Sequence, residues 1–269
     1  MSAIVHLGRW QDTIPDVECD AVISDPPYGA RTHDGALQGG EMADGRRLNL
    51  TDRARGGDGC SRVEIDFRCW TPDDVHEFVR SWAPRTARWI VPMTSHDLLP
   101  AWEAAYRDAG WYAFAPIAVV IGGMGVRVLA DGPANWTVHI PVARRRSRSL
   151  GSKAGSIWRS LPGGYAGPAT PDMAGGRGKP RWLLDALVRD YSRPGDLVCD
   201  PCCGAGTTGV AALTTGRRCL LSDAMLAHAK IAAKAVSTPI QRPLAAPMPG
   251  ETVTQPELFR DEDSNANHL

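Results

Sequence analysis

The chain has 269 residues, 43% of them hydrophobic, and its 30 basic residues balance its 30 acidic residues. A chain of this size and composition can bury one large α/β core and requires no second domain. No apolar run approaches membrane-spanning length, and the N-terminus lacks the basic and apolar regions of a signal peptide, so we expect a soluble cytoplasmic protein.

Hydrophobic periodicity and helix start signals predict alternating strands and helices. The expected strands are 4–7, 20–24, 88–92, 111–121, 136–142, 196–200 and 218–222, and the expected helices are 71–82, 95–110, 181–191, 210–215 and 224–236. Strands 111–121 and 136–142 have the alternation of a hairpin. Segment 30–62 lacks periodicity and is interpreted as a long loop, and 237–269 as a disordered tail.

Residues 25–28, Asp-Pro-Pro-Tyr, directly follow the expected strand 20–24. The Asp25 side chain and the Pro26 carbonyl can accept hydrogen bonds, and no proline N–H competes for them. The Tyr28 ring can stack on a planar group. This combination suits an exocyclic amine held in the plane of a heterocyclic base. Taken alone, however, an X-Pro-Pro turn that only ends a strand is an equal alternative.

A glycine-rich turn, Gly204–Gly209, stands between strand 196–200 and helix 210–215. Backbone N–H groups at a helix N-terminus and small residues allow a polar ligand to approach closely. Asp223 ends the following strand about 20 positions beyond the glycines, where a partner for ribose hydroxyls is expected. The turn is also a G-x-G-x-x-G sequence, so a dinucleotide-binding dehydrogenase is an alternative at this point.

Residues 200–208, Asp-Pro-Cys-Cys-Gly-Ala-Gly-Thr-Thr, resemble the DPFCGSGTT motif with which DNA amino-methyltransferases bind S-adenosylmethionine. Residues 25–28 resemble the DPPY motif of the same family. Two motifs of one family in one chain favour this family over the dehydrogenases. The resemblance covers about residues 3–236, and the order of catalytic motif, basic segment and cofactor motif is that of the beta group.

The resemblance implies a methyltransferase catalytic domain over residues 1–236. Its expected fold is α/β, a Rossmann-like seven-stranded mixed sheet with helices on both faces and an antiparallel edge hairpin. The implied catalytic residues are Asp25, Pro26, Pro27 and Tyr28, and the implied cofactor is S-adenosylmethionine. The residues that the family would use to bind it are Lys179, Asp200, Pro201, Cys203, Gly204, Gly206, Thr207, Thr208 and Asp223.

Three positions depart from the family's pattern. Cys202 replaces a Phe that packs near the adenine of the cofactor, and Ala205 replaces a Ser. Arg9 follows Gly8 after the first strand, where members usually carry an Asp that contributes to the adenine pocket; Asp12 is the nearest acid.

Basic residues concentrate in 143–181, which contains nine of them and only one acidic residue, Asp172. A local basic stripe is the expected footprint of phosphate binding, and a merely solvated basic loop is the alternative. Trp158 and Tyr165 can stack on nucleotides or anchor the loop. Within a recognition segment of about 143–178, the residues expected to bind DNA are Arg144, Arg145, Arg146, Arg148, Lys153 and Arg159.

Seven cysteines, an odd number, do not form the pattern of a disulfide framework. Cys199 and Cys202 form a C-x-x-C, but Cys60 and Cys69 are a poor second pair for zinc, so we expect no metal. The expected partner is double-stranded DNA, with no membrane association and a monomer or homodimer.

The implied reaction is methyl transfer from S-adenosylmethionine to adenine N6 in a flipped-out base. An Asp at the first motif position favours adenine; N4-cytosine methylation is the alternative. A catalytically silent nucleic-acid-binding protein is a further alternative, against which the intact Asp25 and Tyr28 argue. The loop 30–62 is expected to close over the flipped base. A restriction–modification, phage or regulatory role all remain compatible with the sequence.

Overall fold

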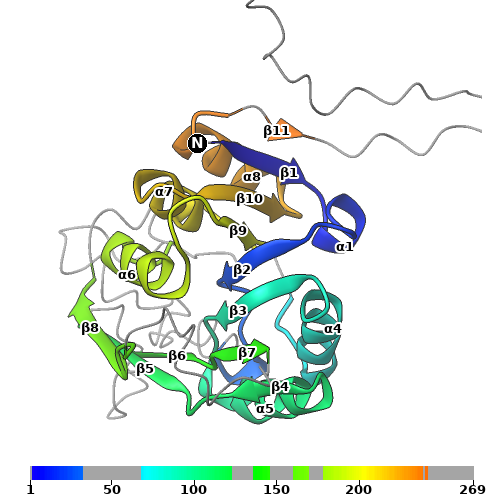
Figure 1. Cartoon of the computed structure of the whole chain (residues 1–269), viewed down its shortest axis with the longest axis vertical. Coiled ribbons are helices and arrows are strands. Elements are labelled where there is room, and N and C mark those ends of the chain that lie inside the picture. The colour runs from blue at the N-terminus through cyan, green and yellow to red at the C-terminus, as the bar shows by residue number, and fades with distance from the viewer. Residues whose placement is uncertain are drawn as a thin grey trace, which may run out of the picture.

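The computed structural model describes residues 2–32, 68–122, 136–145, 160–169, 178–238 and 240–241. These residues form an eight-stranded sheet with helices on both faces and a second, three-stranded sheet beside it (Figure 1). The expected α/β class with a mixed sheet is confirmed. Most of the expected loop 30–62 and of the tail beyond 237 lies outside the described residues.

The large sheet is parallel except at one edge. In spatial order its strands are β11 (Ile240–Gln241), β1 (Ala3–Leu7), β10 (Arg218–Asp223), β9 (Leu197–Asp200), β2 (Cys19–Ser24), β3 (Thr86–Pro92), β7 (Ala143–Arg145) and β4 (Trp111–Ala113). β7 runs antiparallel to both of its neighbours, β3 and β4. The described residues thus give eight strands rather than the expected seven, with the short β11 paired to β1.

The second sheet divides the expected hairpin. Its strands are β6 (Thr137–Ile140), β5 (Ile117–Gly122) and β8 (Gly164–Pro168), with β5 in the middle. The segment 111–121 was expected as one strand, but β4 joins the large sheet and β5 pairs with β6 away from it. Pro116 and Pro141 account for the break, because a proline cannot donate to a strand ladder.

All expected helices are present within a few residues of their predicted bounds. The helices are α1 (Trp10–Thr13), α4 (Pro72–Trp82), α5 (Leu99–Asp108), α6 (Arg181–Tyr191), α7 (Thr207–Thr214) and α8 (Leu226–Ala235), and a short 3₁₀ helix, η1 (His96–Leu98), precedes α5. The start of α4 is a capping box, in which the Thr71 side chain accepts from the Asp74 N–H and the Asp74 side chain accepts from the Thr71 N–H. The short elements α1, β7, β8 and β11 were not predicted.

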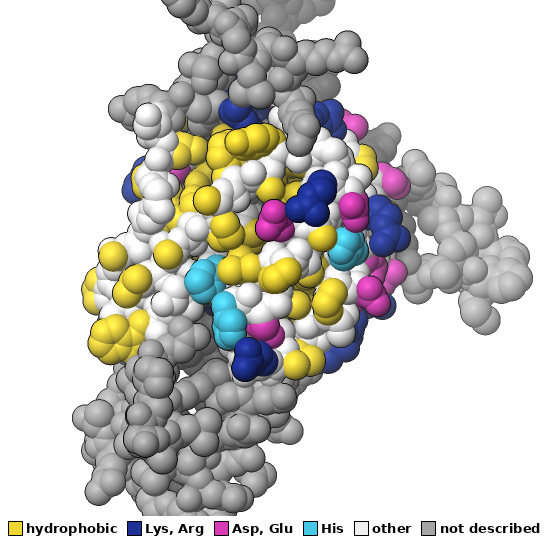
Figure 2. Space-filling view, turned by 90° about the horizontal axis from the view of Figure 1, so that it is seen from below, with side chains coloured by type: hydrophobic (Ala, Val, Ile, Leu, Met, Phe, Trp, Pro, Cys, Tyr) yellow, Lys and Arg dark blue, Asp and Glu magenta, His cyan; other side chains and the backbone are white. Residues whose placement is uncertain are grey.

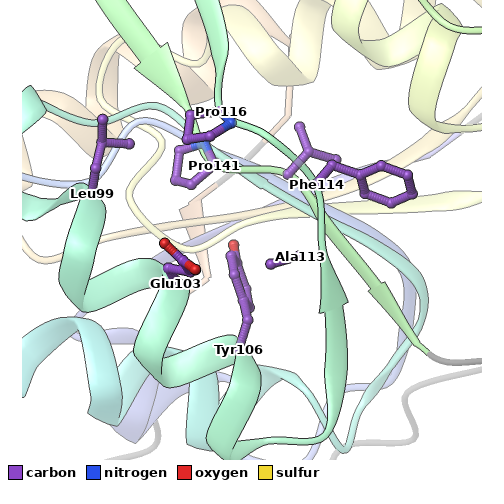
Figure 3. Close-up of a pocket in the computed structure, with 8 residues that line it drawn as sticks. Leu99, Glu103, Tyr106, Ala113, Phe114, Pro116 and Pro141 are labelled. Atoms are coloured by element: carbon purple, nitrogen blue, oxygen red, sulfur yellow. The ribbon is translucent and has the colours of Figure 1, made fainter.

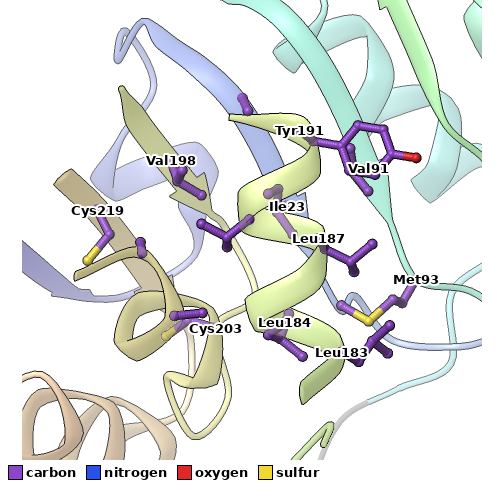
Figure 4. Packing of buried hydrophobic residues seen from close by; sticks show 14 of the residues in the cluster. Ile23, Val91, Met93, Leu183, Leu184, Leu187, Tyr191, Val198, Cys203 and Cys219 are labelled. Carbon is purple, nitrogen blue, oxygen red and sulfur yellow. The ribbon is translucent and has the colours of Figure 1, made fainter. Parts of the chain in front are cut away.

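Alternating side chains of the central strands face two separate hydrophobic clusters. Ala21 and Ile23 of β2 pack in the cluster that contains α6, α7 and α8, whereas Val22 packs in the cluster that contains α4 and α5. Figure 4 shows Leu184 and Leu187 of α6 lying against the first of these faces. Burial on both faces explains why the strand sequences are continuously apolar.

The strand order has a topological switch point between β2 and β9, and we use the word crevice for the region outside the carboxyl ends of these two strands. These strands are parallel neighbours, but the chain continues from β2 to β3 on one side and from β9 to β10 on the other. Open α/β sheets bind ligands outside the carboxyl ends of strands at such a switch point. The Asp-Pro-Pro-Tyr segment follows β2 and the glycine turn follows β9, so both predicted motifs lie at this crevice.

The contact between α7 and α8 requires a glycine. Gly206, the N-cap of α7, has a φ of 79°, and a Cβ there would lie 2.8 Å from the Ala232 backbone Cα. Gly204 has a φ of 51°, but a Cβ there would meet no atom within 4 Å. The two glycines therefore share a left-handed backbone and differ in the space around them.

We expect Gly206→Ala to lower the free energy of unfolding more than Gly204→Ala. The left-handed backbone costs about 1–2 kcal/mol in either variant, and overpacking against Ala232 adds about 1–3 kcal/mol at position 206 alone. Urea unfolding followed by circular dichroism measures both values. Equal losses of stability would show that contact with α8 is not what requires the glycine.

Candidate active site

A buried hydrogen bond joins the ends of β2 and β9. Ser24, fully buried at the end of β2, donates from Oγ to Asp200 Oδ1 at 2.7 Å. The Cys202 N–H donates to the same oxygen at 3.2 Å. The hydrogen bonds hold the start of the catalytic segment against the start of the glycine turn. Sequence reasoning missed Ser24, although it directly precedes Asp25.

Asp25 has one carboxylate oxygen paired and one free. Lys179 Nζ donates to Asp25 Oδ2 in an ion pair, and the side chains of Lys179 and Asp25 are only 14% and 27% exposed. Asp25 Oδ1 is buried, and nothing in the described part of the chain hydrogen-bonds to it. Because a buried, unpartnered carboxylate oxygen is costly, this position suits a donor that a ligand supplies.

Tyr28 lies beside the same ion pair. Lys179 Nζ is 4.8 Å from the centroid of the Tyr28 ring, within cation–π range. The Tyr28 hydroxyl is buried and, like Asp25 Oδ1, makes no hydrogen bond of good geometry with the described residues, although it interacts with the Asp25 side chain. Burial, followed by the negative charge of Asp25, raises the pKa of Tyr28 well above its ordinary value, so the ring stays neutral.

Neighbouring segments fix the backbone of the catalytic motif. The Trp70 N–H donates to the Tyr28 carbonyl at 3.0 Å, and the Gly29 N–H donates to Ser95 Oγ at 3.0 Å. A Cβ at Gly29 would overlap the Asp97 carboxylate, so a side chain there would require Asp97 to move. The motif is thus held from the segment before α4 and from the segment after β3, neither of which was predicted to contribute.

Asp223 ties the glycine turn to the segment before α8. Its Oδ2 accepts from the Gly204 N–H and its Oδ1 from the Met225 N–H, both at 2.9 Å. His228 Nδ1 also lies 3.4 Å from Oδ1, so Oδ2 is the oxygen that keeps capacity for a second hydrogen bond from a ligand hydroxyl. Asp223 is buried, so its carboxylate is held in place by these contacts.

The glycine turn itself fits a polar ligand. Space is open where a Cβ of Gly204 would project, and no side chain caps α7 at Gly206. The N–H groups of the first helical turn have no intrahelical acceptor, so they are available to an acceptor from outside the helix. Together with Asp223, these groups can hold a ligand that combines a ribose with an anionic end.

The DNA-binding prediction falls only partly on described residues. Arg144 and Arg145 lie on β7, whereas positions 146, 148, 153 and 159 are outside the described residues. Arg145 Nη2 donates to the Pro84 carbonyl at 2.9 Å, and the Arg144 guanidinium lies 5.6 Å from the centroids of the Trp89 and Phe114 rings. Both arginines therefore have structural contacts, and their binding to phosphates stays a prediction.

Of the four basic residues of 143–181 that the structure describes, two pair with acids. Arg181 pairs with Asp185 of its own helix, as Lys179 pairs with Asp25. Tyr165 donates to Asp190 at 2.7 Å, which anchors β8 on α6. Basic and acidic side chains of the described residues are interspersed on the face in Figure 2. Counting charges along the sequence missed this pairing.

The described residues offer no cluster of three or more His, Cys, Asp and Glu side chains placed to hold a metal ion. None of the described helices is long and apolar enough to cross a membrane. A separate hollow beside α5 contains none of the site residues (Figure 3). The residues that line it are Leu99, Glu103, Tyr106, Ala113, Phe114, Pro116, Pro141 and Val142.

Asp200 carries a pH dependence of stability. Burial raises its pKa from 3.8 to about 7, against the opposing hydrogen bonds from Thr208, Ser24 and the Cys202 N–H. Because the folded state holds this proton more tightly than the unfolded state, the stability contribution is complete below about pH 4 and is lost as the pH rises through 7.

We expect Asp200→Asn to remove this decline while keeping an acceptor for Ser24. The wild-type free energy of unfolding should fall relative to that of the variant by up to about 4 kcal/mol between pH 4 and 8. Urea unfolding at several pH values measures the difference. Parallel pH profiles for the two proteins would contradict a buried, proton-binding Asp200.

Comparisons with known proteins agree with this site. Residues 153–234 match the N6/N4 methyltransferase family model described as DNA methylase. A 56-residue stretch is 43% identical to the type II methyltransferase M2.DpnII of Streptococcus pneumoniae, covering 21% of this chain and 21% of that relative. The match thus spans about a fifth of the relative's length.

Three solved structures share the fold. The complex of M1.HpyAVI with SAM has a TM-score of 0.56 at 15% identity, covering 87% of this chain and 99% of that one. The putative DNA modification methylase TTHA0409 of Thermus thermophilus, complexed with S-adenosyl-L-methionine, has a TM-score of 0.56 at 17% identity, covering 91% of this chain and 100% of that one.

The third is the PvuII DNA methyltransferase, described as cytosine-N4-specific. It has a TM-score of 0.58 at 10% identity, covering 87% of this chain and 86% of that one. Residues 153–234 of the chain, which carry the glycine turn and Asp223, are thus similar to the N6/N4 DNA methylase family, and the described residues share the fold of these solved DNA methyltransferases.

Proposed function

We propose that the chain is a DNA methyltransferase that uses S-adenosylmethionine to methylate adenine N6 in a flipped-out base. One observation carries the proposal: the free Asp25 Oδ1 and the Tyr28 ring lie after β2, while the glycine turn and Asp223 lie after the adjacent β9 and β10. An acceptor site for an amine and a site for a ribose-bearing ligand thus share one crevice.

The catalytic segment would act on the amine. An aromatic amine is a poor nucleophile, because its lone pair is delocalised into the ring. Asp25 Oδ1 and the Pro26 carbonyl would each accept a hydrogen bond from one N–H of the amine. These hydrogen bonds would favour a pyramidal nitrogen. Stacking of the base on Tyr28 would contribute about 1–3 kcal/mol, comparable to the few kcal/mol that base flipping costs.

The glycine turn and Asp223 would hold the cofactor. Asp223 would accept from ribose hydroxyls, and the first-turn N–H groups of α7 would face its polar end. S-adenosylmethionine, when bound, supplies a methyl group that its sulfonium already activates. The protein's remaining task is to align the amine with that methyl group, which is catalysis by positioning.

Cytosine N4 is the second candidate. The Asp at position 25 favours adenine, but the fold is shared equally with the PvuII enzyme, described as cytosine-N4-specific. The two bases present the same kind of exocyclic amine to Asp25, so the acceptor geometry alone supports either. The partner in both cases would be double-stranded DNA, with Arg144 to Arg159 as predicted phosphate contacts.

Product analysis tests the proposal. The protein is incubated with methyl-labelled S-adenosylmethionine and unmethylated duplex DNA, and the DNA is digested to nucleosides. We expect labelled N6-methyladenine. N4-methylcytosine would replace the adenine assignment, and retention of DNA without any methyl transfer would favour a binding protein with a retained fold.

We expect Asp25→Ala to lower the rate of methyl transfer by at least about 100-fold and to leave the cofactor dissociation constant nearly unchanged. The reason is that Asp25 faces the amine, while cofactor contacts lie after β9 and β10. Single-turnover rates and isothermal titration calorimetry measure the two effects. Asp185→Ala, which removes an acid paired on α6, is the matched control. A comparable loss of cofactor binding in Asp25→Ala would contradict the assignment.

Asp223→Ala should show the opposite emphasis. Loss of a charged acceptor for ribose hydroxyls should raise the cofactor dissociation constant about 10- to 100-fold, with a modest effect on the rate at saturation. Because Asp223 also anchors the Gly204 and Met225 N–H groups, the melting temperature should fall as well. Unchanged affinity in a folded variant would remove Asp223 from the cofactor site.

A further inference from the structure

Lys179 is built into the catalytic side of the crevice. It stands directly before α6, and the Pro180 carbonyl accepts the Leu183 N–H at 3.1 Å as the helix begins. Leu183, Leu184 and Leu187 of α6 are buried in the cluster that contains Ile23 of β2 (Figure 4). The backbone that carries Lys179 is therefore fixed relative to the strand that carries Asp25.

Asp25 has an acidic neighbour at the end of the adjacent strand. Asp200 is the last residue of β9, and the charge of Asp25 contributes to its raised pKa after the larger effect of burial. In the described part of the chain, Lys179 is the cation paired with this carboxylate.

Two neighbouring carboxyl groups disfavour the state in which both are ionised, because their negative charges repel. A protonated Asp25 would present an O–H donor to the amine instead of an acceptor. Lys179 opposes this outcome by its charge. By occupying Oδ2, it also leaves Oδ1 as the single free oxygen.

We propose that Lys179 is a positioning residue: it keeps Asp25 ionised, directs Oδ1 toward the target amine, and so sets the acid limit of the reaction. This inference rests on the proposed function for its catalytic consequence. The pairing of Lys179 with Asp25 can be tested without that function, because it determines the titration of Asp25 in the protein alone.

The test compares Lys179→Met, Lys179→Arg and the matched control Arg181→Met, which removes a cation that pairs within α6 instead. Carboxyl ¹³C NMR titration of the free protein reports the pKa of Asp25, with the signal assigned by Asp25→Asn. We expect Lys179→Met to raise it by about 1–3 pH units, and Lys179→Arg and Arg181→Met to leave it near the wild-type value.

The pH profile of kcat/KM on duplex DNA should follow the same order. In Lys179→Met, the acid limb of the profile should move to higher pH by as much as the pKa of Asp25 rises. Activity should recover at high pH. Cofactor affinity, measured by calorimetry, should change little. If Lys179→Met does not fold, Lys179→Gln replaces it, since the amide can donate to Asp25 but carries no charge, and it should shift the titration in the same direction.

The outcomes separate the two proposals. An unchanged Asp25 titration in the neutral variant, or a loss of activity that is equal at every pH, would overturn the role of Lys179. If the wild-type protein transfers no methyl group while the titration shifts as expected, the proposed function fails and the Lys179–Asp25 pairing stands. A loss of cofactor affinity without a shifted titration would instead place Lys179 in the cofactor site.

Discussion

The buried hydrogen bond from Ser24 Oγ to Asp200 Oδ1 is the contact on which the site depends. It joins residues that are 176 positions apart at the carboxyl ends of β2 and β9. Each strand ends in a segment with its own chemistry, and the bond fixes the distance between them. The proposed methyl transfer would require the two reacting groups to be held in line at close range, so this spacing would matter more than either motif alone.

Two neighbouring carboxyl groups have different environments in this crevice. Burial favours the neutral form of Asp200, with a pKa of about 7, whereas Asp25 has the Lys179 ammonium beside it. When the environments of two acids favour different protonation states, the two acids can serve different functions. Asp200 can hold the strand ends together without a second negative charge at the site, which leaves the acceptor role to Asp25.

The features that the sequence predicted correctly are those that depend on residues close together in the chain. The acceptor of the Asp-Pro-Pro-Tyr motif, the glycine turn and Asp223 each follow a strand, and their positions follow from the strand order. The pairing of Lys179 with Asp25 spans 154 residues, and periodicity contains no information about it. The alternation of apolar and polar residues likewise predicted the strands β5 and β6. It did not predict which sheet they join, because a strand with one buried face has the same alternation in either sheet. The phosphate contacts of positions 146–159 lie outside the described residues and stay predictions.

The strand order also makes the site depend on both ends of the described chain. β1 pairs with β10, and the Cys219 N–H donates to the Ser2 carbonyl at 3.1 Å, so the strands that carry the glycine turn and Asp223 are completed by the first strand. β2, which precedes the Asp-Pro-Pro-Tyr segment, in turn pairs with β9. We expect contacts of such long sequence separation to slow folding, since the loop-closure entropy is lost before they stabilise the chain. Neither half can therefore complete the crevice until β9 and β10 have paired with the N-terminal strands.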